Sequence, residues 1–130
     1  MSKRISFLIY KILYFIDLFF FKITKIRFLI WFNEFIQSDS YKSILIFNKK
    51  VFFFVPNQLI QYRIDTFFTK EPETLKWIDD FKKDKKVIFW DIGSNIGLYS
   101  MYAALKHSNI EICSFEPSSS NLRVLSRNIS

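Results

Sequence analysis

The placement of glycine constrains this chain more than any other feature. The 130-residue sequence contains only two glycines, Gly93 and Gly97, and both lie in the seven-residue stretch Asp91–Gly97. Glycine allows a backbone to turn sharply and to approach a ligand without a clash at Cβ. Because the chain uses glycine nowhere else, these two residues indicate a loop that lies beside a bound ligand.

The residues around this loop predict an α/β fold. Val87–Trp90 is a continuous apolar run, which is typical of a strand buried on both faces. Leu98–Lys106 then predicts a helix, and Ile110–Phe115 predicts a second strand. Ser118–Ile129 predicts a second helix. A strand, helix, strand and helix in this order begin a parallel α/β sheet.

Upstream of these elements the pattern predicts a β-hairpin and a further helix. Ile44–Phe47 and Val51–Val55 are β-branched and aromatic runs, separated by the polar turn Asn48–Lys50. Pro72 suits the first turn of a helix, and Glu71 suits the positive end of a helix dipole. Glu71 has a second interpretation, contact with a ligand, and both remain open.

Residues 1–43 predict a basic amphipathic helical segment. On a helical wheel four cations fall within about 60° of one another, and these are Arg4, Lys11, Lys22 and Lys25. Aromatic and aliphatic side chains occupy the rest of the circumference. A membrane-spanning helix needs about 20 mostly apolar residues, and charges interrupt every such window here. The segment also lacks the features of a secretory signal.

Two interpretations of this segment remain open. Residues 4–30 form a helix on the cytoplasmic face of an anionic membrane, or the helix packs on its own domain or on a partner. The formal charge of +7 does not decide between them, although residues 87–130 are neutral, so the excess lies upstream. No nucleic-acid-binding signature occurs, and nucleic acid is the least favoured partner. The oligomeric state is left open.

Three features of the sequence meet at one edge of the predicted sheet. Asp91 closes the first strand, the two glycines open the first helix, and Glu116 closes the second strand. In open parallel sheets, ligands bind beyond the carboxyl ends of the strands. The glycine spacing differs from the dinucleotide fingerprint and from the P-loop. An acid here suits a ligand with an ammonium group, and the single Cys113 and His107 provide no cluster for a metal ion.

These residues resemble a known family. Asp-Ile-Gly-Ser-Asn-Ile-Gly-Leu-Tyr-Ser at 91–100 and Phe115-Glu116-Pro117 resemble the first two motifs of class I S-adenosylmethionine-dependent methyltransferases, and more narrowly the FkbM family. Asn121 and Asn128 are typical of that family. The upstream segments that resemble its entry region are Val55-Pro56-Asn57, Tyr62-Arg63 and Lys70–Asp79. The resemblance covers about residues 44–130.

The resemblance implies a Rossmann-like methyltransferase fold with S-adenosyl-L-methionine as cofactor. The cofactor-binding residues that it implies are Asp91, Gly93, Ser94, Asn95, Gly97 and Glu116. Asp91 would face the ammonium of the methionine moiety, and Glu116 would accept hydrogen bonds from the ribose hydroxyls. The glycines would admit the cofactor to the backbone, and Ser94 and Asn95 would expose amides beside it.

The family also implies a reaction, methyl transfer to a hydroxyl of a carbohydrate or small molecule. It assigns no catalytic residue within this sequence. Such folds have seven strands, so we expect residues 44–130 to be the amino-terminal part of a methyltransferase domain. We expect this chain to be a fragment that is unstable and inactive alone. The competing hypothesis is a non-enzymatic membrane-associated or interaction module that retains a remnant of the fold.

Overall fold

The structure is a computed structural model that describes residues 2–82 and 84–129. Contacts divide the chain into two compact units, with the boundary between Asp39 and Ser40. We call them the helical unit and the α/β unit and describe each by itself. This contact boundary lies slightly before residues 43 and 44, where the sequence pattern places the division between domains.

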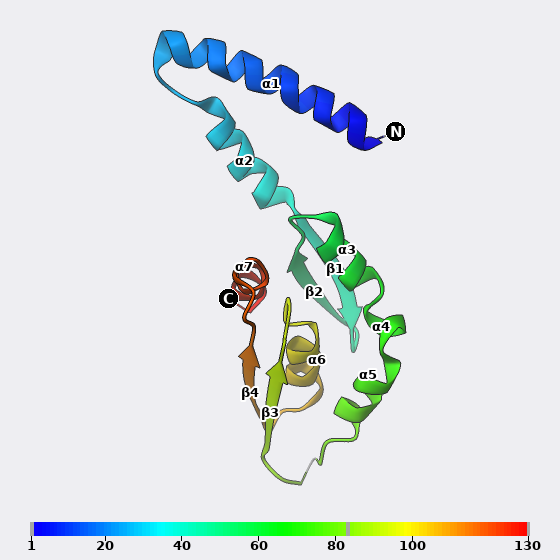
Figure 1. The fold of residues 1–130 in the computed structure, drawn as a ribbon. Helices are drawn as coiled ribbons and strands as arrows, with labels where there is room; N and C mark the ends of the chain where they lie inside the picture. The colour runs from blue at the N-terminus through cyan, green and yellow to red at the C-terminus, as the bar shows by residue number, and fades with distance from the viewer. Residues whose placement is uncertain (1, 83, 130) are drawn as a thin grey trace. The chain divides into compact units, whose positions relative to one another are not determined.

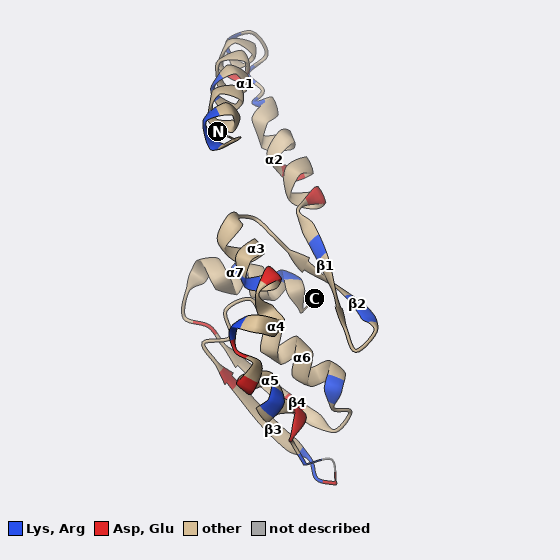
Figure 2. Ribbon diagram, turned by 90° about the vertical axis from the view of Figure 1, so that its right-hand side faces the viewer, with Lys and Arg blue, Asp and Glu red and all other residues tan. Residues whose placement is uncertain are grey.

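The helical unit contains two helices, α1 (Ser2–Thr24) and α2 (Phe28–Asp39), as Figure 1 shows. The chain breaks between them at Lys25, which has a left-handed φ of 60°. The basic residues of this unit lie mostly along α1 (Figure 2). Within the described residues, no helix combines the length and apolarity that crossing a membrane requires.

A buried carboxylate joins these two helices. Asp17 of α1 is fully buried, and its Oδ1 accepts a hydrogen bond from the backbone N–H of Leu29 at 3.1 Å. Its Oδ2 pairs with the guanidinium of Arg27. The amides of the first helical turn have no partners within their own helix, and Asp17 satisfies one of them in α2. This contact explains why the segment forms two helices.

We expect the carboxyl of Asp17 to titrate below its ordinary pKa. Burial opposes ionisation, but the hydrogen bonds from Leu29 and Arg27 outweigh it and lower the pKa of Asp17. The carboxylate therefore stabilises the helical unit above a pH of about 4, and this contribution disappears as the pH falls through the lowered pKa. NMR of the side-chain carbon, with Asp17→Asn to assign the signal, would measure it. A pKa at or above the ordinary value would contradict this account.

The α/β unit begins with the predicted hairpin. Strand β1 (Tyr41–Ile46) pairs antiparallel with β2 (Lys49–Phe54). The turn is shorter than predicted, because Phe47 and Asn48 alone connect the strands, with φ values of 49° and 61°. Two left-handed residues match the twist of a two-residue hairpin, and this geometry brings Lys49 and Lys50 into the second strand.

Three helices follow the hairpin: α3 (Gln58–Asp65), α4 (Phe67–Lys70) and α5 (Pro72–Asp79). The sequence pattern predicted only α5, which begins at Pro72 as expected. The start of α3 has a clear signal, since the side chain of Asn57 accepts a hydrogen bond from the N–H of Ile60 at 3.0 Å. Asparagine is a favoured residue at this position.

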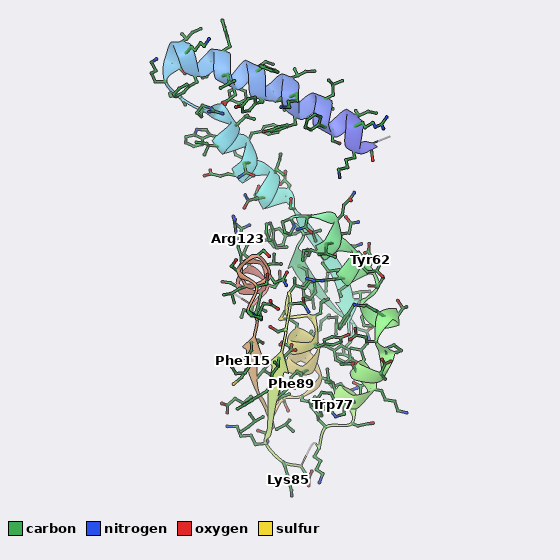
Figure 3. All side chains as sticks on the ribbon, viewed as in Figure 1. Tyr62, Trp77, Lys85, Phe89, Phe115 and Arg123 are labelled. Carbon is green, nitrogen blue, oxygen red and sulfur yellow. The ribbon has the colours of Figure 1, made fainter. Side chains whose placement is uncertain are left out.

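The predicted strand–helix–strand–helix order is confirmed, but the expectation that the first strand is buried on both faces is wrong, because Ile88 and Trp90 on one face are exposed. Strand β3 (Val87–Ile92) pairs parallel with β4 (Ile110–Phe115), and helices α6 (Leu98–Lys106) and α7 (Ser119–Asn128) follow the two strands. Phe89 lies on β3 and Phe115 on β4 (Figure 3). Since both strands end in register, the segments that follow them begin at one edge of the sheet.

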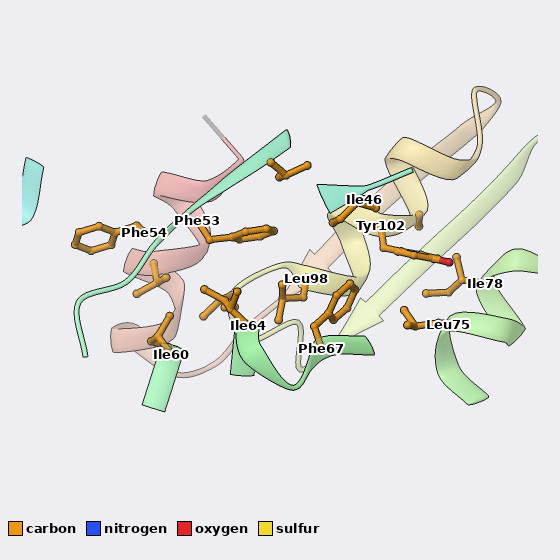
Figure 4. Packing of buried hydrophobic residues seen from close by; sticks show 14 of the residues in the cluster. Ile46, Phe53, Phe54, Ile60, Ile64, Phe67, Leu75, Ile78, Leu98 and Tyr102 are labelled. Carbon is orange, nitrogen blue, oxygen red and sulfur yellow. The ribbon is translucent and has the colours of Figure 1, made fainter. Parts of the chain in front are cut away.

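The core of the α/β unit joins the hairpin, the three short helices, β3, α6 and α7 (Figure 4). One polar side chain crosses it. Asn128 of α7 is buried; its Oδ1 accepts from the N–H of Phe54 at 2.9 Å, and its Nδ2 donates to the carbonyl of Ile96 at 2.8 Å. This amide therefore ties the hairpin, α7 and the loop before α6 together.

Candidate functional site

The loop between β3 and α6, which we call the glycine loop (residues 93–97), has an unusual backbone. Gly93, Asn95 and Gly97 have φ values of 79°, 52° and 84°, a region that glycine occupies readily and asparagine tolerates. The N–H groups of Gly93 and Ser94 both donate to the carbonyl of Phe115, at 2.8 and 3.0 Å. The glycine loop is thus attached to the end of β4.

Gly97 also has a packing role. A Cβ at this position would lie 2.6 Å from Cδ1 of Leu125 in α7, whereas a Cβ at Gly93 would meet no atom within 4 Å. Gly97 therefore permits α7 to approach the start of α6. At Gly93 the space beside the backbone is open, so the two glycines serve different purposes.

Glu116 is an ordered acid at the same edge. Its Oε2 accepts from the N–H of Asn95 at 2.7 Å, and its Oε1 accepts from the N–H of Ser118 at 2.8 Å. The bond from Ser118 contributes most to lowering the pKa of Glu116; bonds from Asn95 and Asn121 add to it, against an opposing effect of burial. Glu116 is therefore an ionised acceptor, and carboxylate oxygens have further lone pairs for a hydroxyl donor.

The backbone amides that the resemblance implied for cofactor binding are occupied in the structure. The N–H of Ser94 bonds to the carbonyl of Phe115, and the N–H of Asn95 bonds to Glu116. These two groups organise the loop itself. The side chain of Asn95 is engaged as well, since its Nδ2 donates to the carbonyl of Gly93 at 2.9 Å and its Oδ1 accepts from Asn121 at 3.3 Å. Of these two side chains, only that of Ser94 keeps a group without a partner among the described residues, its hydroxyl.

Asp91 lies on the side of β3 that α6 covers. It is buried, and its Oδ2 accepts a hydrogen bond from Oγ of Ser100 in α6 at 2.6 Å. Oγ of Ser100 also lies 2.7 Å from Oγ of Ser114 on β4. Burial raises the pKa of Asp91, and the bond from Ser100 offsets part of that effect. The carboxyl is therefore held inward, against the helix that follows the glycine loop.

A small cavity opens beside the glycine loop, with a volume of about 100 Å³. Its lining residues are Arg63, Phe67, Lys70, Glu71, Ser94, Asn95, Ile96, Leu98 and Tyr99. The hydroxyl of Ser94 is buried, with only 4% of the residue exposed, and has no hydrogen-bond partner within the described residues. Leaving such a group unpaired costs about 1–3 kcal/mol, and the residue that carries it lines the cavity.

Charged groups of both signs lie at this cavity. Glu71 accepts a hydrogen bond from the hydroxyl of Tyr99 at 2.9 Å, and its other oxygen lies 3.6 Å from Nζ of Lys70. Arg63 donates to the side chain of Asn121 at 3.2 Å. Burial, and then the bond to Glu71, raise the pKa of Tyr99. Tyr99 therefore stays neutral and acts as a hydrogen-bond donor at physiological pH.

The structure leaves both interpretations of Glu71 open. The residue occupies the position before α5, yet its side chain makes no capping hydrogen bond there. Instead its carboxylate points to Tyr99 at the cavity. Its negative charge still lies at the positive end of α5, so the arrangement is compatible with stabilisation of the helix and with contact to a ligand.

The cavity brings together only part of the predicted site. Ser94 and Asn95 line it, whereas Asp91, Gly93, Gly97 and Glu116 lie outside its lining. Sequence reasoning assigned no site role to three further lining residues: Arg63, Lys70 and Tyr99. Two of these lie in the upstream segments that resemble the FkbM entry region, which was the available signal. Comparisons with protein-family models, curated proteins and solved structures gave no match to this chain.

Proposed function

We propose that the α/β unit belongs to an S-adenosyl-L-methionine-dependent methyltransferase. The observation that carries the proposal is the unpaired, buried hydroxyl of Ser94, a residue that lines a cavity with charges of both signs. An amino-acid end has a carboxylate for Arg63 and Lys70 and an ammonium for Glu71. Hydrogen bonds to charged groups are the stronger ones, so this chemistry matches the cavity.

The size of the cavity supports the same assignment. At about 100 Å³, the cavity is smaller than the pockets of about 300–1,000 Å³ that hold drug-sized ligands, which suits the amino-acid end rather than a whole cofactor. Glu116, beyond the cavity at the same edge, is an ionised acceptor suited to ribose hydroxyls. Asp91 lies under the loop, and we propose that its negative charge favours the bound ammonium from there.

The bound cofactor supplies an electrophilic methyl group on a sulfonium. The residues of this chain bind and orient that group, and rate acceleration by such enzymes comes largely from positioning. We propose a hydroxyl of a carbohydrate or small molecule as the acceptor and the cytoplasm as the location. The choice of this acceptor is supported by the sequence resemblance.

Calorimetry with S-adenosylmethionine and S-adenosylhomocysteine tests the proposal, and Ser94→Ala is the sharpest variant. We expect Ser94→Ala to weaken binding about 2- to 10-fold, because one hydrogen bond to the ligand is lost. The same change should leave the free energy of unfolding unchanged or raise it by up to about 1 kcal/mol, since it removes an unpaired buried hydroxyl. Ser126→Ala, on the exposed side of α7, is the matched control.

Two outcomes would contradict this assignment. If the unmodified chain binds neither ligand at millimolar concentration, S-adenosylmethionine is not its cofactor. Loss of stability in Ser94→Ala, without a change in affinity, would mean that the hydroxyl serves the fold. Asp91→Ala tests the buried carboxylate in the same assay, and we expect weaker binding of both ligands.

We propose a second candidate, a non-enzymatic membrane-associated or interaction module, because of the helical unit. Most large apolar side chains of α1 and α2 are exposed, and exposed apolar patches mark interaction sites. The calorimetric experiment separates the candidates. A chain that binds neither ligand but retains its fold favours the second.

A further inference from the structure

One side of α1 carries a continuous row of exposed apolar side chains, which we call the apolar stripe. Its members are Ile5, Leu8, Ile12, Phe15, Ile16, Phe19 and Ile23, which are 50% to 68% exposed. They recur at intervals of three and four residues, so they share one face of the helix. At 1.5 Å per residue the stripe extends for about 27 Å.

Helix α2 lies against the other side of α1. Asp17 is buried there by its bonds to Arg27 and Leu29, and the rings of Phe20 and Phe28 meet edge to face at 5.9 Å. On a helical wheel Asp17 lies about 150° from the centre of the stripe. Within the helical unit, the stripe therefore lies on a face of α1 that α2 leaves uncovered.

Cations border the apolar stripe along its length. Arg4, Lys11 and Lys22 are seven and eleven residues apart, which places them on one line along the helix; we call them the cation row. Asp17, the one acid of α1 among the described residues, lies on the other face and is paired with Arg27. The exposed face of α1 thus combines apolar and positive groups without an acid, and Figure 2 shows the basic positions.

We propose that α1 lies flat on a bilayer surface that contains anionic lipids. The stripe enters the boundary between headgroups and acyl chains, and the cation row reaches the lipid phosphates along the border. Long basic side chains can bury their stems while their charges stay in water, and interfacial helices combine these features. Charge complementarity selects this occupant, because a lipid surface presents anions along the whole row.

This inference deepens the second candidate function and also holds if the α/β unit binds a cofactor. The stripe and the cation row lie entirely in α1, whereas cofactor binding concerns residues 63–116. Loss of S-adenosylmethionine binding would therefore leave the membrane proposal intact, and the reverse also holds.

Vesicle flotation of the full chain tests the role of charge. We expect partition onto vesicles of phosphatidylcholine with phosphatidylglycerol, much weaker partition onto phosphatidylcholine alone, and a decrease with added salt. The triple variant Arg4→Gln, Lys11→Gln and Lys22→Gln should bind on the order of 100-fold more weakly. The control is a second triple variant, which changes three exposed lysines of the α/β unit: Lys49→Gln, Lys76→Gln and Lys85→Gln. It removes the same charge and should retain binding.

A second pair of variants tests the stripe. Phe15→Asn with Phe19→Asn should weaken partition at least about tenfold, while circular dichroism stays unchanged because both rings are exposed. The control is Phe35→Asn. Phe35 belongs to α2 and is 64% exposed but lies outside the stripe, so this variant should bind vesicles like the unmodified chain. Equal binding of the charge variant would overturn the proposal. Absence of vesicle binding by the unmodified chain would also overturn it. Dissociation of an oligomer or a complex by the stripe variants would then assign the stripe to a protein interface.

Discussion

Gly97→Ala is expected to lower the free energy of unfolding of the α/β unit by about 2–4 kcal/mol. The left-handed backbone at φ 84° costs an alanine roughly 1–2 kcal/mol. The new methyl would also lie 2.6 Å from Leu125 Cδ1. Leu125 is 2% exposed and has little room to move away, so overpacking adds about 1–3 kcal/mol. Chemical denaturation followed by circular dichroism measures the sum.

Gly93→Ala is the matched control for this change. Its φ of 79° is almost the same, but its Cβ would enter open space, so only the backbone cost of about 1–2 kcal/mol remains. A double-mutant cycle of Gly97→Ala with Leu125→Ala isolates the contact, because the smaller side chain relieves the clash. Equal losses at Gly93 and Gly97 would show that contact with α7 is not the reason.

Asn128→Ala is expected to cost about 2–4 kcal/mol, because it leaves two buried backbone groups unpaired at about 1–3 kcal/mol each. These groups are the N–H of Phe54 and the carbonyl of Ile96. They belong to different parts of the unit, so we expect α7 and the hairpin to lose their alignment together. The midpoint of urea denaturation measures the effect, and a loss below about 0.5 kcal/mol would refute the role that we assign to this amide.

Asn128→Asp distinguishes the two hydrogen bonds. An aspartate still accepts from the N–H of Phe54, but it has no proton for the carbonyl of Ile96 and places a charge against it. We expect a loss of stability at neutral pH at least as large as for alanine. The difference should shrink in acid, where the protonated carboxyl again donates. A variant without this pH dependence would show that the bond to Ile96 contributes little.

The elements with strong hydrophobic patterns were predictable from the sequence. The helix at Leu98–Lys106 and the strand at Ile110–Phe115 have the predicted bounds, because polar residues interrupt the apolar pattern at both ends. Helix α3 was not predicted, since a short helix has little pattern of its own. The cap at Asn57 with Ile60 and Ile64 was the signal that could have identified it.

The candidate site was predictable only in part. Glycine identified the loop, because its backbone conformations are costly for other residues. The cavity also needs Arg63 and Lys70, which come from earlier helices, and no local pattern places them beside Ser94. The inward side of Asp91 follows from the alternation of strand β3, since Phe89 and Asp91 share one face. The engaged amides of the loop depend on the exact position of Phe115, which only the fold determines.

The double hydrogen bond to the carbonyl of Phe115 has a consequence for ligand affinity. Gly93 and Ser94 donate to it, and Asn95 donates to the next residue, Glu116. The glycine loop and the end of β4 therefore form one preorganised body. A ligand at this edge does not have to order the loop on arrival, and immobilising flexible groups is a major cost of binding. Contacts made here are thus converted to affinity with little entropic loss.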